Sequence, residues 1–125
     1  IRRMVELEGF NIDIIDCPIM REIDGLAMSS RNVRLTPSQR QIAPAIYKAL
    51  VASIDYAKSH SVKETKQHVI DEINAQPEME VEYYEIVDSL TMQPINNWDD
   101  SNCPVGCITV YCGEVRLIDN IKYTK

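Results

Sequence analysis

Residues Arg21–Leu35, REIDGLAMSSRNVRL, decide how this chain is organised. They separate a short strand-like run from a strong helix start, so we expect a connecting loop. Ser29 and Ser30 carry hydroxyl groups and are small enough for backbone N–H groups to approach an anion. Arg31 adds a planar, permanently charged donor that suits phosphate. The stretch predicts a phosphate-binding loop, although a solvated connector with an incidental arginine would contain the same residue types.

Strong helix signals follow the loop. Thr36 with Gln39 has the spacing of a capping box, so a helix should begin here and run to Ala57, with a kink or tightened turn at Pro44. A second capping box at Ser61 predicts a helix over 62–74.

Three strands are predicted after the helices. They are 81–87, 105–112 and 115–121, and the last two should form an antiparallel hairpin across Gly113 and Glu114. In the first strand we expect Val81, Tyr83 and Val87 to share one face. Trp98 lies within the loop over 89–104, between the first two strands, and should anchor that loop on the core.

The segment before the loop predicts one more helix and one more strand. Residues 1–8 have a helical apolar stripe that stops near Gly9, and residues 11–17 should form a short buried strand. The predicted fold class is therefore α+β. A small three-stranded antiparallel sheet packs against two helices and is preceded by a helix-strand remnant of an N-terminal Rossmann-like α/β domain.

Composition limits the classes of function. The chain has 125 residues with 45% hydrophobic and 26% charged side chains, which is typical of one globular domain. A net charge of −6 argues against nucleic-acid and anionic-membrane partners. No apolar run reaches the roughly 20 residues that span a bilayer, so we expect a cytoplasmic protein.

The four cysteines are Cys17, Cys103, Cys107 and Cys112. The last three invite a zinc interpretation, but their spacing is unusual for zinc and Cys107 and Cys112 should face opposite sides of a strand. We expect reduced, buried thiols and assign no residue to a metal.

Four parts of the chain share one resemblance. They are IRRMV at 1–5 with residues 12–21, DGLAMSSRN at 24–32, YEIVD at 84–88 and RLIDNI at 116–121. In their order and approximate spacing they resemble the pantothenate synthetase (pantoate beta-alanine ligase) family. The second run is similar to the family signature, which takes the place of the KMSKS loop of class I nucleotidyltransferases.

This resemblance implies a ligase that joins D-pantoate to β-alanine on the way to coenzyme A. ATP and pantoate would first give pantoyl adenylate and pyrophosphate. The amine of β-alanine would then attack the acyl carbon and release AMP. Mg²⁺ would share the charge of the triphosphate.

The resemblance also assigns roles to residues of the loop. Ser29, Ser30 and Arg31 would contact the phosphates of ATP and are the candidate catalytic residues. Met28 would contact the nucleotide by packing and main chain, and Met20 through its backbone.

The family enzyme is longer than this chain, and its HxGH motif has no counterpart here, where the only histidines are His60 and His68. Since the chain opens on Ile1, we expect a C-terminal portion that is inactive alone. Residues 1–20 would be the tail of the N-terminal nucleotide-binding domain, 21–35 the ATP loop and 36–125 a lid domain. The expected partners are the missing N-terminal domain and a second copy in a homodimer. The alternative is a noncatalytic, self-associating interaction module.

Other candidates have weaker support. Arg21 and Asp24 could brace the loop by an ion pair or could both be solvated. Arg116 and Asp119 lie far along the chain from the loop, so a structural role is expected for both. The two histidines should lie at the surface or at its boundary.

Overall fold

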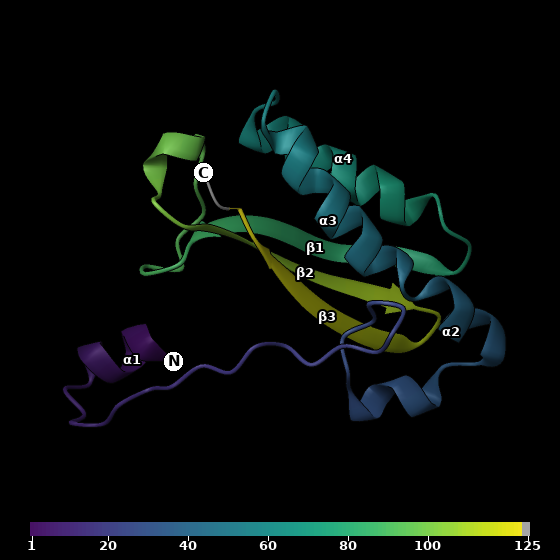
Figure 1. Cartoon of the computed structure of the whole chain (residues 1–125), viewed down its shortest axis with the longest axis horizontal. Coiled ribbons are helices and arrows are strands. Elements are labelled where there is room, and N and C mark those ends of the chain that lie inside the picture. The colour runs from purple at the N-terminus through teal and green to yellow at the C-terminus, as the bar shows by residue number, and fades with distance from the viewer. Residues whose placement is uncertain (124–125) are drawn as a thin grey trace.

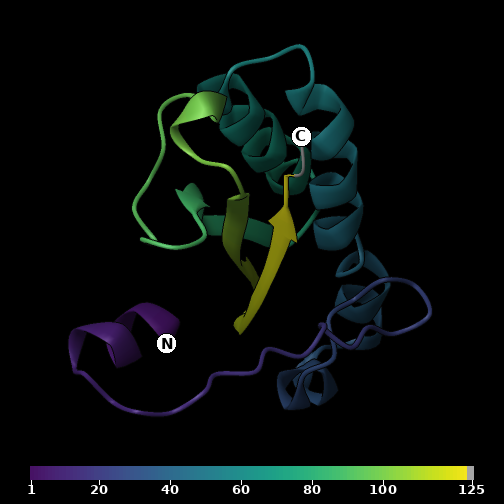
Figure 2. The ribbon, with the colours of Figure 1, turned by 60° about the vertical axis from the view of Figure 1, so that its left-hand side comes forward.

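Three strands form one antiparallel sheet in the order β1-β2-β3 in this computed structural model, which describes residues 1–123. They are β1 (Met79–Asp88), β2 (Pro104–Cys112) and β3 (Val115–Lys122). Two helices, α3 (Ala45–Ala57) and α4 (Val62–Asn74), cover one face of the sheet (Figure 1). The opposite face carries no helix in either view of the described chain (Figure 2). The predicted sheet and its two helices are confirmed.

The β2–β3 hairpin is the tight turn that the sequence predicts. Cys112 pairs with Val115, so two residues connect the strands. Gly113 has φ +57°, a conformation that only glycine adopts without strain. A Cβ atom there would lie 2.3 Å from Nε2 of Gln39, so the turn also packs closely against the helical layer.

A β-bulge in β1 changes which side chains face the core. The register shifts between Val81 and Tyr83, so Glu82 is an extra residue in this strand. Val81 packs against the core, whereas Tyr83 is 45% exposed. The prediction that these two side chains share a face was wrong because the bulge adds a residue between them.

The helical layer begins with α2 (Pro37–Ile42). Both predicted capping boxes form, at Thr36 with Gln39 and at Ser61 with Glu64. At Pro44 the chain makes a tightened turn, because Ile46 N–H donates to the carbonyl of Ala43 over 3.2 Å. The turn separates α2 from α3 but keeps the backbone helical.

The apolar core lies between the helices and the sheet. It is built from fully or nearly fully buried side chains of both the helices and the strands. Its largest members are Leu50, Ile73, Tyr84, Ile86 and Ile108.

Trp98 fixes the β1–β2 connection to the core, as predicted. It begins a short 3₁₀ helix, η2 (Trp98–Asp100). Its Nε1–H donates to the carbonyl of His60 over 2.8 Å, and its ring lies 5.0 Å from that of Tyr123. His60 and His68 stack on the two sides of Tyr56 and are half-buried, as expected of boundary residues.

The predicted N-terminal helix forms as α1 (Arg2–Leu7), but the predicted strand over 11–17 does not. Within residues 1–123 no neighbouring strand pairs with that segment, so its backbone has no ladder to join. The guanidinium of Arg2 donates instead to the carbonyl of Ile14 over 3.0 Å. Of the thiols predicted to be buried, Cys112 is buried, and Cys103 and Cys107 are half-buried. Cys17 is exposed, so its predicted burial was wrong.

None of the helices in residues 1–123 combines the length and apolarity needed to cross a membrane.

Candidate functional site

The loop predicted to bind phosphate starts as a tight, folded-back turn. Arg21 pairs with Ala27 in an isolated antiparallel bridge, and Met28 N–H donates to the carbonyl of Met20 over 2.9 Å. Gly25 at the tip has φ +94°, and a Cβ atom there would lie 2.4 Å from the ring of Tyr47. The turn therefore lies directly against α3.

An ion pair fastens this turn to the sheet. The guanidinium of Arg21 donates to both carboxylate oxygens of Asp119 on β3, over 2.6 and 2.8 Å. The two side chains are 18% and 4% exposed, and the guanidinium lies 3.8 Å from the ring centroid of Tyr47. The hydrogen bonds that Arg21 donates to Asp119 raise the pKa of Arg21. The pairing of Arg21 with Asp24 considered from the sequence was wrong, since Asp24 pairs with Arg40 over 2.6 Å.

Ser29 determines how the loop continues. Its Oγ accepts the N–H of Arg31 over 3.1 Å and caps a 3₁₀ helix, η1 (Ser30–Arg34). Asn32 Nδ2 donates to the carbonyl of Ala27 over 3.0 Å. The Oδ1 atom of Asn32 is buried and has no hydrogen-bond partner among the described residues.

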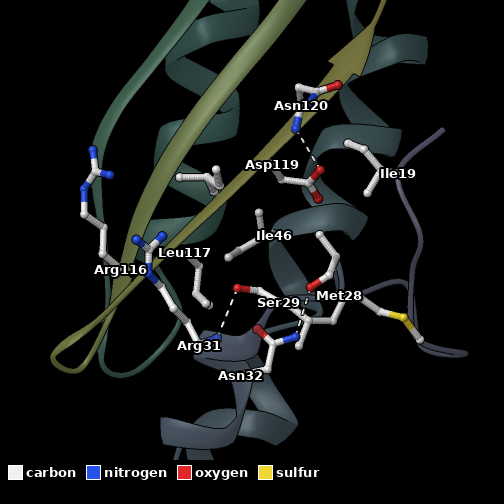
Figure 3. A pocket seen from close by; sticks show the side chains of 13 residues that line it. Ile19, Met28, Ser29, Arg31, Asn32, Ile46, Arg116, Leu117, Asp119 and Asn120 are labelled. Carbon is white, nitrogen blue, oxygen red and sulfur yellow. Dashed lines mark hydrogen bonds between the residues drawn. The ribbon is translucent and has the colours of Figure 1, made fainter. Parts of the chain in front are cut away.

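A cavity of about 330 Å³ lies between this loop and β3 (Figure 3). Its wall contains three of the five predicted ATP-binding residues: Met28, Ser29 and Arg31. Met20 and Ser30 do not line it, although both are exposed next to residues that do. The structure thus brings most of the predicted site together around one space.

Arg31 is the exposed cation of this cavity. Figure 3 shows its side chain extending from η1 along the wall. Its backbone N–H is used by Ser29, but within residues 1–123 its guanidinium makes no hydrogen bond or ion pair. Its five guanidinium N–H groups therefore have no partner among the described residues and can donate to an anion.

Sequence reasoning missed the contribution of β3. Five consecutive residues of β3, from Arg116 to Asn120, line the cavity, although most of the chain separates them from the loop. Arg116 Nε donates to a carboxylate oxygen of Glu82 over 2.6 Å, and this bond raises the pKa of Arg116. The available signal was the family-like run at 116–121, which contains all five of these residues.

A model of the Pantoate-beta-alanine ligase family matches residues 1–122. Among curated proteins, the pantothenate synthetase of Phocaeicola vulgatus is 56% identical over 124 residues, and that of Porphyromonas gingivalis strain W83 is 54% identical over 123. Both alignments cover 98% of this chain. The chain spans only 44% of the length of these relatives.

Solved structures agree with this similarity. Pantothenate synthetase from Thermus thermophilus superposes with a TM-score of 0.87 at 38% identity, covering 99% of this chain and 45% of that one. The ligase from Francisella tularensis, described as complexed with β-γ ATP and β-alanine, has a TM-score of 0.53 at 26% identity, covering 96% and 37%. With the family model matching almost from end to end and relatives more than half identical, this chain belongs to the pantoate-beta-alanine ligase family.

Proposed function

We propose that this chain is the C-terminal part of an ATP-dependent ligase that condenses D-pantoate and β-alanine to pantothenate through pantoyl adenylate. Membership of the family and the names of the relatives support the overall reaction. The complex of the Francisella tularensis ligase supports the use of ATP and β-alanine. The structural observation that best supports the proposal is that Arg31, with an unpaired guanidinium, lines the same cavity as Met28 and Ser29.

In this proposal the loop holds ATP. Arg31 donates to the phosphates and follows the charge as it moves to the leaving pyrophosphate. Ser29 and Ser30 donate their hydroxyl protons to phosphate oxygens. Ser29 can do so while its Oγ still accepts the N–H of Arg31, because a hydroxyl both donates and accepts. Met28 packs on the nucleotide, and Met20 contacts it through its backbone.

We propose a division into residues 1–20, the tail of the nucleotide-binding domain, 21–35, the ATP loop, and 36–125, a lid. The ion pair of Arg21 with Asp119 supports a lid that carries the loop with it, since it joins the loop to β3. Closure of such a lid would exclude water from the adenylate.

The other half of the ligase is the proposed partner of the N-terminal segment. Several large apolar side chains there are more than half exposed and would be covered by that half. They are Ile1, Met4, Leu7, Phe10, Ile12 and Ile15. A homodimer of the whole protein and a cytoplasmic location, where ATP is available, are also part of the proposal. Alone, this chain should be inactive.

Mg²⁺ belongs to the proposal as a companion of the ATP phosphates. Among residues 1–123, no group of three or more His, Cys, Asp or Glu side chains is arranged to hold a metal ion. We therefore assign no residue of this chain to the metal and no step to it.

A hybrid enzyme tests the proposed function. Residues 1–125 would replace the matching segment of the Phocaeicola vulgatus protein, which aligns over 98% of this chain. The hybrid should form pantothenate and release AMP only when pantoate, β-alanine and ATP are all present. It should also catalyse pantoate-dependent exchange between pyrophosphate and ATP, which reports the adenylate. This chain alone should do neither.

A folded hybrid without ligase activity would contradict the proposal. If this chain alone also ran as a stable oligomer on gel filtration, the noncatalytic, self-associating module would replace the ligase as the proposed function.

A further inference from the structure

We propose that Arg116 is a second cationic contact for the nucleotide phosphates, next to Arg31, and that it exchanges its partner Glu82 for a phosphate when ATP binds. The inference rests on the proposed function and adds to it a binding residue from the sheet. The phosphates would then be held from two elements, η1 and β3.

Arg116 lies at the same cavity as two of the predicted phosphate-binding residues. It lies on the cavity wall together with Ser29 and Arg31. Figure 3 shows the side chains of Arg31 and Arg116 extending along the same side of the cavity. η1 lies against β3, so the two arginines come from elements that touch. Two arginines on one cavity wall can bind an anion with several charges.

The ion pair of Arg116 with Glu82 is weak enough to be exchanged for a phosphate. Its bond to Glu82 is short, 2.6 Å, but the two side chains are 41% and 38% exposed. An ion pair this exposed contributes little net stability, because water competes for both charges. A polyphosphate offers more negative charge and more acceptor oxygens than one carboxylate, so it can displace Glu82.

The partner of Arg116, Glu82, is the extra residue of the β-bulge in β1. The register shift between Val81 and Tyr83 makes Glu82 an extra, exposed residue of β1. Arg116 and Glu82 lie on the two outer strands, β3 and β1, so their side chains meet across β2. The carboxylate thus holds the guanidinium in place while ATP is absent.

Opposite effects of the two partners distinguish this role from a structural ion pair. If the pair only stabilises the sheet, removing either partner should have the same consequence. If Arg116 binds phosphate and Glu82 competes for it, Arg116→Gln should weaken ATP binding and Glu82→Gln should strengthen it.

The experiment uses the hybrid enzyme described above, with Lys66→Gln as the matched control. Lys66 pairs with Glu85 over 2.7 Å in a partly exposed ion pair and does not line the cavity. Arg116→Gln should raise the KM for ATP about tenfold, as loss of a charged hydrogen bond does. Glu82→Gln should lower it, and Lys66→Gln should leave it unchanged. The KM for β-alanine should stay constant in all three.

An unchanged KM for ATP in folded Arg116→Gln, or an equal rise in Arg116→Gln and Glu82→Gln, would overturn the inference. Melting temperatures separate binding from folding. If Arg116→Gln does not fold, the fall of KM in Glu82→Gln decides the question alone. An inactive unaltered hybrid would count against the proposed function, whereas an active hybrid with an insensitive KM counts only against Arg116.

Discussion

Arg21 and Asp119 lie 98 residues apart in the chain, yet they share two hydrogen bonds of 2.6 and 2.8 Å. This pair joins the start of the candidate ATP loop to the last strand of the sheet. Both side chains are largely removed from solvent, so neither charge can be rehydrated without moving the loop.

We predict that Asp119→Asn lowers the free energy of unfolding by about 3 kcal/mol, because it leaves the guanidinium of Arg21 buried without its counter-charge. Urea denaturation of the chain would measure the change. Asp16→Asn is the control, since Asp16 pairs with Arg2 in solvent and should matter little. Equal losses in the two variants would show that the Asp119 pair is no stronger than a surface contact.

Arg31→Gln should reduce the kcat of the hybrid enzyme about 100-fold, the usual cost of removing one donor to developing charge. Its melting temperature should not change, since the guanidinium makes no hydrogen bond or ion pair within residues 1–123. Arg34→Gln is the matched control, because Arg34 is exposed on the same η1 helix and does not line the cavity. Similar losses of kcat in both variants would refute a specific role for Arg31.

Local signals predicted most of the fold. The capping boxes at Thr36 and Ser61 and the glycine turn at Gly113 involve residues close in sequence, and each determines a local backbone geometry. The strand expected at 11–17 failed because a strand needs a neighbour, and pattern alone does not supply one.

Only the loop half of the candidate site could be predicted from the sequence, because the other half depends on contacts between distant elements. The loop residues could be recognised from their chemistry and from the family signature. The pairing of Arg21 with Asp119 and the presence of Arg116 and Arg31 on one cavity depend on how β3 packs against the loop. Such contacts are set by the packing of distant elements, so the sequence could not show them.

Gly106→Ala should destabilise the chain by about 2 kcal/mol, because it overfills a packed core. A Cβ atom at Gly106 would lie 2.3 Å from the hydroxyl of Tyr84, which is 2% exposed and hydrogen-bonded to Tyr123. Adding Tyr84→Phe removes the closest contact, so the double variant should lose less stability than the sum of the single variants. Chemical denaturation of all three checks this, and simple additivity would mean that the clash is relieved elsewhere.

Because of Asp88, the free energy of unfolding should fall as the pH is lowered in the acid range. Its carboxylate accepts hydrogen bonds from Ser101 Oγ over 2.6 Å and from the N–H of Thr91 over 2.8 Å, which lowers its pKa to about 2. A lowered pKa means that the unfolded chain binds the proton first. The stabilisation is therefore complete above the ordinary pKa of 3.8 and is lost as the pH falls through about 2.

Asp88→Asn should consequently be less stable than the unaltered chain near neutral pH, and the difference should narrow between about pH 4 and pH 2. Urea denaturation at several pH values measures both curves. Ser101→Ala removes the donor with the largest effect on this pKa, so it should flatten the pH dependence while keeping the carboxylate. A difference between Asp88→Asn and the unaltered chain that stays constant down to pH 2 would mean that the carboxylate has the same proton affinity in the folded and unfolded chain.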